Sequence, residues 1–345
     1  MMADAVNALS HPDWEKLNMS DATKKRLWAG LDLGGTKMLA KAYNAKFEEL
    51  GRKRVKTAAQ EGAKAGLQRI GDTIETALEK ADKDTESLAG IGVGCPGPID
   101  LEKGVLIEAA NLGWTKVKIR DALQERFNCP VYLLNDVDAG VYGEYRFGAG
   151  KGAHCVMGIF PGTGVGGGCV YDGKIILSKN GTCMEVGHVQ VDPDGPLCGC
   201  GRYGCLEAVS SRLAISAAVA QAAYRGQAPH LLETAGTDIA QIRSGVLASS
   251  IKNGDKVVEQ IIRDAARNIG LAVAGIVNLL APDVIVLGGG LVEAMPDLFV
   301  EEVRTAARGR VMDSYVDAFT VAAAELADDA GVLGCAAWAE KNVGG

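Results

Sequence analysis

Apolar and polar positions along this chain fall into blocks that predict alternating strands and helices. Trp28 to Leu33 is a short apolar run containing Asp32, and Met38 to Tyr43 is a second one. The turn between them, Gly34-Gly35-Thr36-Lys37, consists mainly of small residues, so the segment predicts a β-hairpin. Backbone N–H groups without side-chain bulk around them can surround phosphate oxygens, which makes this turn a candidate phosphate site. The GxxxxGK[ST] spacing of a Walker A loop is absent.

The same pattern returns about 130 residues later. Cys155 to Phe160 is an apolar run, the segment 162–168 (GTGVGGG) follows it, and Cys169 to Tyr171 is apolar again. A strand is therefore expected to enter a turn rich in glycine and threonine, and a second strand to leave it. Two such hairpins predict a duplicated domain in which each half offers one phosphate-binding turn. In the second half the candidate residues are Gly162, Thr163 and Gly164.

A third glycine cluster lies further along the chain. The pattern from Val257 to Leu280 predicts a long helix packed in a core, and Val284 to Leu287 predicts a buried strand. Gly288, Gly289 and Gly290 follow this strand. Glycine at a strand end would let a flat adenine or a ribose approach the backbone.

Between the two hairpins, a buried strand is expected to end at Asn135 and Asp136, where a helix begins. Ligands in open α/β sheets bind at the carboxyl ends of strands, so Asp136 is placed to accept a proton from a substrate hydroxyl. Phosphoryl transfer needs little more than such a base and charge stabilisation at the phosphate. Taken alone, Asp136 is better explained as a helix N-cap. Asp138 is a second candidate base, expected to lie inside the helix.

Composition narrows the class of protein. A chain of 345 residues suggests two domains, with 48% hydrophobic and 23% charged residues. The net charge of −7 gives no electrostatic reason to expect nucleic-acid binding. No apolar run suits a membrane span, and the first 27 residues lack the apolar core of a signal peptide. We therefore expect a cytoplasmic protein with no nucleic-acid or membrane partner.

One His and three Cys within eighteen residues form the strongest chemical signal. His188, Cys198, Cys200 and Cys205 have the types and number of ligands that a closed tetrahedral zinc site requires. The other six of the nine cysteines are dispersed singly, which is typical of a reducing compartment rather than of a disulfide framework. Reduced structural thiols and a surface His are the alternative interpretation.

Taken together, these motifs resemble the ROK family of sugar kinases, within the hexokinase, Hsp70 and actin ATPase-domain superfamily. The resemblance runs in order from about Leu27 to Ala339. It is carried by the segments 32–37 (DLGGTK), 92–98 (GVGCPGP), 134–140 (LNDVDAG), 162–168 (GTGVGGG), 185–188 (EVGH), 198–207 (CGCGRYGCLE), 286–290 (VLGGG) and 329–334 (DAGVLG).

The resemblance implies a role for each matching residue. Asp136 matches the catalytic base that takes the proton from the sugar 6-hydroxyl, and His188, Cys198, Cys200 and Cys205 match the zinc ligands. The residues matching those that hold the sugar hydroxyls are Asn111, Asn135, Glu185, His188 and Glu207. The residues matching the two phosphate motifs are Asp32, Gly34, Gly35, Thr36 and Lys37, and then Gly162, Thr163 and Gly164.

The expected architecture is α/β, with two ribonuclease-H-like domains of the actin/hexokinase type and an active-site cleft between them. An extension covers residues 1–27, the small domain covers 28–135 together with a C-terminal helix at about 331–345, and the large domain covers 136–330. The resemblance further implies structural Zn²⁺, Mg²⁺ with ATP, and a homodimer or dimer of dimers. Asp32 is expected to contact the Mg²⁺ through water.

The leading hypothesis is an ATP-dependent hexokinase acting on glucose. N-acetylhexosamine, N-acetylmannosamine, mannose and fructose remain alternative substrates, polyphosphate remains an alternative donor, and a sugar-binding regulator without activity is a rival from another class. Met184 stands where the family often has glycine, just before Glu185, so the sugar preference stays open. The segment from Gln227 to Ser250 is polar and broken by Gly and Pro, and we expect a variable insertion with exposed helices.

Overall fold

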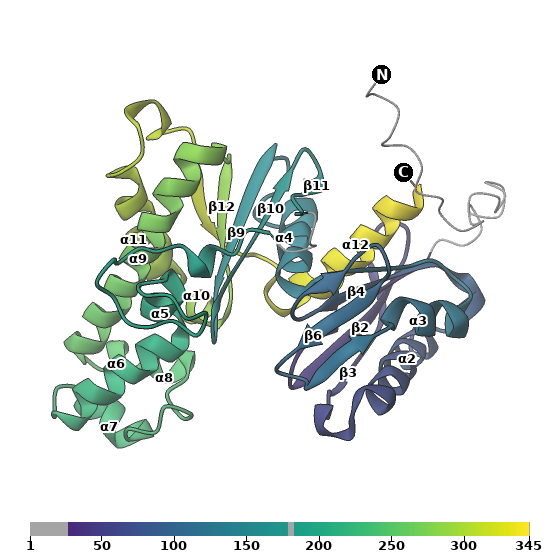
Figure 1. Ribbon diagram of the computed structural model, residues 1–345, viewed down its shortest axis with the longest axis horizontal. Helices are drawn as coiled ribbons and strands as arrows, with labels where there is room; N and C mark the ends of the chain where they lie inside the picture. The colour runs from purple at the N-terminus through teal and green to yellow at the C-terminus, as the bar shows by residue number, and fades with distance from the viewer. Residues whose placement is uncertain (1–26, 179–182, 345) are drawn as a thin grey trace. The chain divides into compact units, whose positions relative to one another are not determined.

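The computed structural model describes residues 27–178 and 183–344, and these divide into two compact units. Of the described residues, unit 1 comprises 27–134 and 335–344, and unit 2 comprises 135–178 and 183–334. Each unit is built around its own five-stranded sheet (Figure 1). The predicted N-terminal extension lies outside the described residues, apart from Leu27, which begins the first strand.

The main sheet of unit 1 has the strand order β3-β2-β1-β4-β8, and a smaller sheet has the order β5-β6-β7. The strands are β1 (Leu27–Leu33), β2 (Lys37–Tyr43), β3 (Glu49–Lys56), β4 (Leu88–Cys95), β5 (Ile99–Asp100), β6 (Val105–Ala109), β7 (Trp114–Val117) and β8 (Val131–Asn135). The helices are α2 (Ala63–Glu79), α3 (Ile119–Phe127) and α12 (Ala330–Gly344), which belongs to unit 1 from Cys335 onward.

Side-chain alternation along β4 explains how this sheet is covered on both faces. Ile91 and Val93 are fully buried in the core that also contains Ile70 and Ile74 of α2. The residue between Ile91 and Val93 is Gly92, and a Cβ there would lie 1.8 Å from the carbonyl oxygen of Cys335 in α12. Because neighbouring residues of a strand point to opposite faces, α2 and α12 cover opposite sides of the sheet, as Figure 1 shows.

The sheet of unit 2 has the strand order β11-β10-β9-β12-β13. Its strands are β9 (Cys155–Pro161), β10 (Val165–Tyr171), β11 (Lys174–Ile175), β12 (Val284–Leu287) and β13 (Thr320–Ala323). Its helices are α4 (Asp136–Phe147), α5 (Leu206–Ser210), α6 (Arg212–Tyr224), α7 (Pro229–Ala235), α8 (Ser244–Lys252), α9 (Lys256–Leu280), α10 (Gly290–Ala294) and α11 (Pro296–Arg308).

The second hairpin differs from its prediction in the length of its turn. Only Gly162 to Gly164 lie between the strands, whereas Gly166, Gly167 and Gly168 are inside β10 and pair with β9. A Cβ at Gly166 would lie 2.7 Å from the Val137 side chain of α4, and one at Gly168 would lie 2.9 Å from a carboxylate oxygen of Asp138. These glycines therefore allow α4 to pack closely on the strand rather than extend the turn.

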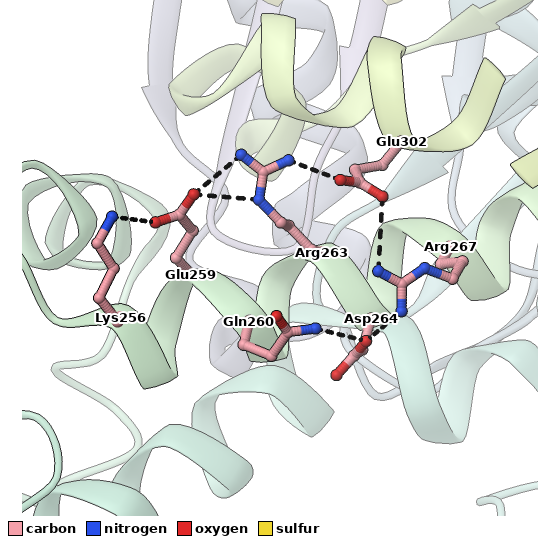
Figure 2. Close-up of polar contacts among 7 residues, drawn as sticks. All are labelled: Lys256, Glu259, Gln260, Arg263, Asp264, Arg267 and Glu302. Carbon is pink, nitrogen blue, oxygen red and sulfur yellow. Dashed lines mark hydrogen bonds and ion pairs between the residues drawn. The ribbon is translucent and has the colours of Figure 1, made fainter. Parts of the chain in front are cut away.

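Helices α9 and α11 pack against each other through an apolar face and a network of charges (Figure 2). Val273 and Val303 are fully buried in the core of unit 2. On the outer side, Arg263 of α9 donates hydrogen bonds to Glu259 at 2.9 Å and to Glu302 of α11 at 2.6 Å. Arg267 adds an ion pair with Glu302 at 3.7 Å. This partly exposed network contributes modestly to stability and fixes the register of the two helices.

The two main sheets share one plan, which confirms the α/β, two-domain expectation. In unit 1, β2 runs antiparallel to β3 and β1, and β1 runs parallel to β4. In unit 2, β10 runs antiparallel to β11 and β9, and β9 runs parallel to β12. Across the described residues, no helix is both long enough and apolar enough to span a membrane.

Candidate functional site

The first glycine turn, Gly34 to Lys37, is held in shape by bonds within unit 1. Gly34 N–H donates to the Lys37 carbonyl at 3.0 Å, and Thr57 N–H donates to the Thr36 carbonyl at 2.9 Å. The buried Thr57 hydroxyl donates to the Gly34 carbonyl at 2.6 Å. These bonds occupy the carbonyl oxygens of Gly34, Thr36 and Lys37, and the side chains of Thr36 and Lys37 are exposed. The arrangement suits an anion, because turn carbonyl oxygens are engaged by these bonds and the Lys37 side chain is exposed beside them.

Two further predicted residues of unit 1 lie close to the first glycine turn. Asp32 is half-buried near the end of β1, two residues before Gly34. The Asn111 amide nitrogen lies 3.0 Å from the position that a Cβ at Gly35 would take. The structure therefore brings the predicted sugar-facing Asn111 to the predicted phosphate turn, although the two are far apart in the sequence.

The second glycine turn, Gly162 to Gly164, closes on its own backbone, with Gly162 N–H donating to the Gly164 carbonyl at 2.8 Å. The Glu207 carboxylate accepts from Val165 N–H at 3.1 Å, immediately after the turn. A Cβ at Gly164 would lie 2.3 Å from this same carboxylate, which explains the need for glycine there. Glu207, predicted to bind sugar, is thus also a support of the phosphate turn.

The strand β8 and the helix α4 together position the candidate base. Asn135, the last residue of β8, is the N-cap of α4, and its side chain accepts from Val137 N–H at 2.9 Å. Asp136 is the first residue of the helix, so the N-cap interpretation of Asp136 is wrong and applies instead to Asn135. Asp138 lies inside the helix, as expected, and is 7% exposed.

The two aspartates of α4 lie in an unfavourable environment for negative charge. Burial raises the pKa of Asp136 above 3.8, and the hydrogen bond from Val137 N–H partly opposes this. Burial also raises the pKa of Asp138 to about 7, with the nearby charges of Asp136 and Glu185 adding to the effect. Near neutral pH, Asp138 is therefore partly protonated, which lowers the charge beside Asp136.

The backbone of the segment from Met184 to His188 is conformationally constrained. Met184 has φ +54°, in the left-handed region where a side chain is strained and glycine is favoured. The Met184 side chain packs partly against the core of unit 2. A Cβ at Gly187 would lie 2.2 Å from the Val165 carbonyl oxygen, so glycine is required between Glu185 and His188. Both of these predicted site residues are exposed.

The four predicted metal ligands come together, and we call them the Cys/His cluster. The ligand atoms of His188, Cys198, Cys200 and Cys205 all lie within 4.8 Å of one another. His188 Nδ1 is 3.7 Å from Cys198 Sγ, and Cys200 Sγ is 3.6 Å from Cys205 Sγ. Bonds of about 2.0 to 2.3 Å in a tetrahedral zinc site separate neighbouring ligand atoms by roughly 3.3 to 3.8 Å. The donor set and its spacing therefore fit a structural zinc.

The third glycine cluster lies at the same end of the unit 2 sheet as the second glycine turn. Strands β9 and β12 are parallel, so their carboxyl ends coincide. Gly288 N–H donates to the Ile159 carbonyl at 3.1 Å, and a Cβ at Gly289 would lie 3.0 Å from the Pro161 carbonyl oxygen. Gly290 begins α10.

A hollow of about 830 Å³ in unit 2 was missed by the sequence analysis. It is lined by Arg212, Leu213, Asp238, Ile239, Ala240, Arg243, Ser244 and Gly245. Most of these residues belong to the segment 227–250, which was expected to be an exposed, variable insertion. Leu231, Ile242 and Leu247 of that segment are instead fully buried in the core of unit 2. The segment is therefore an integral part of unit 2 and forms one wall of the hollow. No motif marked these residues, because only the folded chain places them beside the second glycine turn.

Within unit 1, the structure gathers Asp32, Asn111 and the first glycine turn. Within unit 2 it gathers the Cys/His cluster with Glu207, the aspartates of α4 with Glu185, and the second and third glycine segments.

Comparison with known proteins agrees with this arrangement. The ROK family model matches residues 28–342. A glucokinase of Thermotoga maritima is 33% identical over 317 residues, covering 92% of this chain and 98% of the relative. The crystal structure of a ROK glucokinase from Streptomyces griseus in complex with glucose and AMPPNP has a TM-score of 0.77 at 30% identity, covering 91% of this chain and 99% of that chain.

The family also contains regulators. A xylose repressor of Caldicellulosiruptor bescii is 30% identical over 271 residues, covering 79% of this chain and 67% of the repressor. The glucokinases, in contrast, match this chain over nearly their whole length. The chain therefore belongs to the ROK family and is one of its sugar kinases, with the two-domain fold of the actin and hexokinase type.

Proposed function

We propose that this sugar kinase transfers the γ-phosphoryl group of ATP to the 6-hydroxyl of a hexose, with glucose as the preferred acceptor and Asp136 as the general base. Glucose as acceptor is supported by similarity to the Thermotoga maritima and Streptomyces griseus glucokinases. ATP as donor is supported by the presence of both glycine turns and by the AMPPNP complex of the latter relative.

The position of Asp136 is the observation that carries this proposal. Because Asn135 provides the N-cap, the Asp136 carboxylate is not consumed by that role, and its Oδ1 accepts a hydrogen bond from Val137 N–H at 3.0 Å. Its raised pKa makes it a better proton acceptor than an exposed aspartate. A half-buried carboxylate at the carboxyl end of a strand is suited to take the hydroxyl proton as the phosphoryl group is transferred.

The residues proposed to hold the sugar hydroxyls are Asn111, Asn135, Glu185, His188 and Glu207. Amide, carboxylate and imidazole groups each match one or two hydroxyls by hydrogen bonding. His188 Nδ1 faces Cys198, so a metal on this nitrogen would leave Nε2 for the sugar. The glycine turns are proposed to hold the phosphates. Mg²⁺ would neutralise phosphate charge, and Asp32, half-buried before the first glycine turn, would contact it through water.

We also propose that the Cys/His cluster binds Zn²⁺. Its Cys198 Sγ lies 3.9 Å from Glu207 Oε1, so the metal would fix the loop that carries Glu207 and His188. A metal here is structural, because four protein ligands close a tetrahedral site. We further propose that the protein forms a homodimer or a dimer of dimers, as the resemblance to the family implies.

The test is the rate of ADP formation by Asp136→Asn with Mg-ATP and glucose. The amide keeps the size and shape of the side chain but cannot accept the proton, so turnover should fall by several orders of magnitude while glucose affinity stays within a few-fold. Asp138→Asn is the matched comparison from the same helix. Near-normal turnover of Asp136→Asn, or a larger loss in Asp138→Asn, would remove Asp136 from the role of base.

A panel of acceptors tests the sugar itself. The wild type is offered glucose, mannose, fructose, N-acetylglucosamine and N-acetylmannosamine, and glucose should give the highest kcat/KM. A preference for another sugar would keep the mechanism and change the substrate. Sugar binding by calorimetry without phosphorylation from ATP or polyphosphate would favour the regulator hypothesis, which the similarity to the xylose repressor motivates.

A further inference from the structure

The position of the Glu185 carboxylate depends on a short stretch of backbone. Glu185 precedes the 3₁₀ turn Val186–His188, and its side chain makes no capping hydrogen bond to that turn. The side chain is exposed. Burial raises the pKa of Asp138, and the charge of Glu185 is near enough to add to this effect. The carboxylate therefore lies near α4, and the backbone on either side of Glu185 decides its direction.

The chain that follows Glu185 is fixed by its packing on β10. Val186 is 3% exposed and belongs to the core of unit 2. The next residue, Gly187, has no room for a Cβ beside the Val165 carbonyl oxygen. His188 N–H donates to the Glu185 carbonyl at 3.0 Å, and the proposed zinc would add an anchor at the His188 ring. On this side, the buried valine and the close approach to β10 leave the backbone little freedom.

The chain that precedes Glu185 is held by Met184. Its φ of +54° is a conformation that glycine adopts without strain and a methionine does not. Its carbonyl oxygen accepts from Val186 N–H at 2.7 Å and lies 2.8 Å from the position of a Cβ at Gly167 in β10. The Met184 side chain packs against the core of unit 2. Glycine would relieve the strain but would have no side chain to pack there, so the methionine has an anchoring role that glycine could not fill.

We propose that Met184 is a positioning residue, whose side chain, packed against the core of unit 2, holds the left-handed turn that directs the Glu185 carboxylate to the sugar. The inference rests on the proposed function, in which Glu185 binds a sugar hydroxyl, and it adds a residue that touches no substrate. Because Met184 packs on the core whereas Glu185 is exposed, a change at Met184 moves the carboxylate without removing a group that contacts the sugar.

The experiment measures glucose affinity by calorimetry in Met184→Gly, Met184→Leu and Glu185→Gln. Met184→Gly removes the anchor, whereas Met184→Leu keeps an apolar side chain of similar size at the same strained position. Glu185→Gln should weaken glucose binding by about ten-fold or more, and Met184→Gly by about three- to ten-fold, with Met184→Leu close to the wild type. In turnover assays, the loss in Met184→Gly should appear in the glucose KM and not in kcat or in the KM for ATP.

A double variant separates positioning from general damage to the fold. If Met184 acts through Glu185, then Met184→Gly should have no further effect on glucose affinity once Glu185→Gln has removed the carboxylate. The double variant should therefore bind glucose as Glu185→Gln does.

Two further measurements need no sugar contact. Ala281, after the last residue of α9, is exposed and has φ +44°, so Ala281→Gly relieves strain without removing a packed side chain. This control should raise the unfolding midpoint and leave glucose affinity unchanged. The N–H groups of Val186, His188 and Val189 all donate within the segment, and their hydrogen exchange should accelerate in Met184→Gly but not in Met184→Leu.

Four outcomes would overturn the proposal: unchanged glucose affinity in Met184→Gly, equal losses in Met184→Gly and Met184→Leu, additive losses in the double variant, or unchanged hydrogen exchange in Met184→Gly. Failure of the proposed sugar contact would look different, because glucose affinity would then be insensitive to Glu185→Gln itself. In that case the exchange of Met184→Gly against Met184→Leu would still decide whether Met184 holds the segment.

Discussion

The two units have the same sheet plan and the same glycine hairpin, yet they support the hairpin in different ways. In unit 1, the turn carries its own cation, Lys37, and an uncharged hydroxyl, that of Thr57, holds its backbone. In unit 2, the turn has no lysine, a carboxylate from Glu207 holds the adjacent N–H, and the nearest cation, Arg212, comes from a separate helix.

This difference shows how a duplicated fold becomes specialised. The hairpin provides N–H groups for phosphate in both units, because that property depends only on the backbone and on small side chains. In unit 2, the surroundings add Asp136, Asp138, the Cys/His cluster and a hollow. On the proposed function, unit 1 would contribute mainly to phosphate binding, whereas unit 2 would contribute the base and most of the sugar contacts.

Loss of the metal should have the largest effect on stability, and hydrogen exchange should show that the effect is confined to unit 2. Cys200 is exposed, so Cys200→Ala removes a ligand with little loss of packing. We expect loss of zinc by elemental analysis, a marked fall in the unfolding midpoint and weaker glucose binding, because the metal organises the loop. Hydrogen exchange should rise across residues 183–210 and stay unchanged across residues 27–57.

Cys183→Ala is the control, since Cys183 lies outside the Cys/His cluster. Wild-type protein that contains no zinc, or a chelator that leaves residues 183–210 protected, would show that the cluster is only a set of reduced thiols.

The buried charge of Asp138 should make the stability of unit 2 depend on pH. Its pKa rises from 3.8 to about 7 on folding, so the folded state retains a proton that the unfolded state releases. The resulting contribution is favourable below about pH 4 and is lost as pH rises through 7. At pH 8, Asp138→Asn should therefore be more stable than the wild type, by up to about 4 kcal/mol.

Denaturant unfolding at several pH values measures this effect as the difference between wild type and variant. Asp297→Asn, at an exposed position of α11, is the control. A difference that does not grow between pH 4 and pH 8 would show that Asp138 is ionised throughout in the folded protein.

The smallest effect is expected when the side-chain hydrogen bond that supports the first glycine turn is removed. Thr57→Val removes only the hydroxyl that donates to the Gly34 carbonyl and keeps the bond from Thr57 N–H to Thr36. Stability should fall by about 1 to 2 kcal/mol, and KM for ATP should rise a few-fold. Thr57→Ser, which keeps the hydroxyl, should preserve KM. If the two variants raise KM equally, packing rather than the hydrogen bond supports the turn.

Much of the local structure could be predicted because it depends on neighbouring residues. Alternation of apolar residues with glycine turns predicted both hairpins, and the period of Val257 to Leu280 predicted α9. The ligand spacing of His188 to Cys205 predicted the cluster, because a tight loop brings nearby residues together whatever the rest of the fold does.

Other features depended on packing between distant segments. The predicted length of the second glycine turn was wrong. Gly166 and Gly168 lie in β10, where the absence of a side chain lets Val137 and Asp138 of α4 pack closely on the strand. The Glu207 carboxylate contacts both Cys198 of the Cys/His cluster and Val165 of β10. These two contacts exist because the segment that carries the cluster packs against β10. Thr57 was missed because its partner, Gly34, is 23 residues away.

By itself, then, the sequence determined the two glycine hairpins, the strands that end at Asn135 and Leu287, the Cys/His cluster and the family, all of which follow from spacing along the chain. Only the tertiary structure decided that Asn135 rather than Asp136 caps α4, that Asp138 is buried enough to hold a proton, and that Arg212 stands beside the second glycine turn. The physical reason is that burial, charge environment and hollows are properties of several segments packed together, and no periodicity within one segment records them.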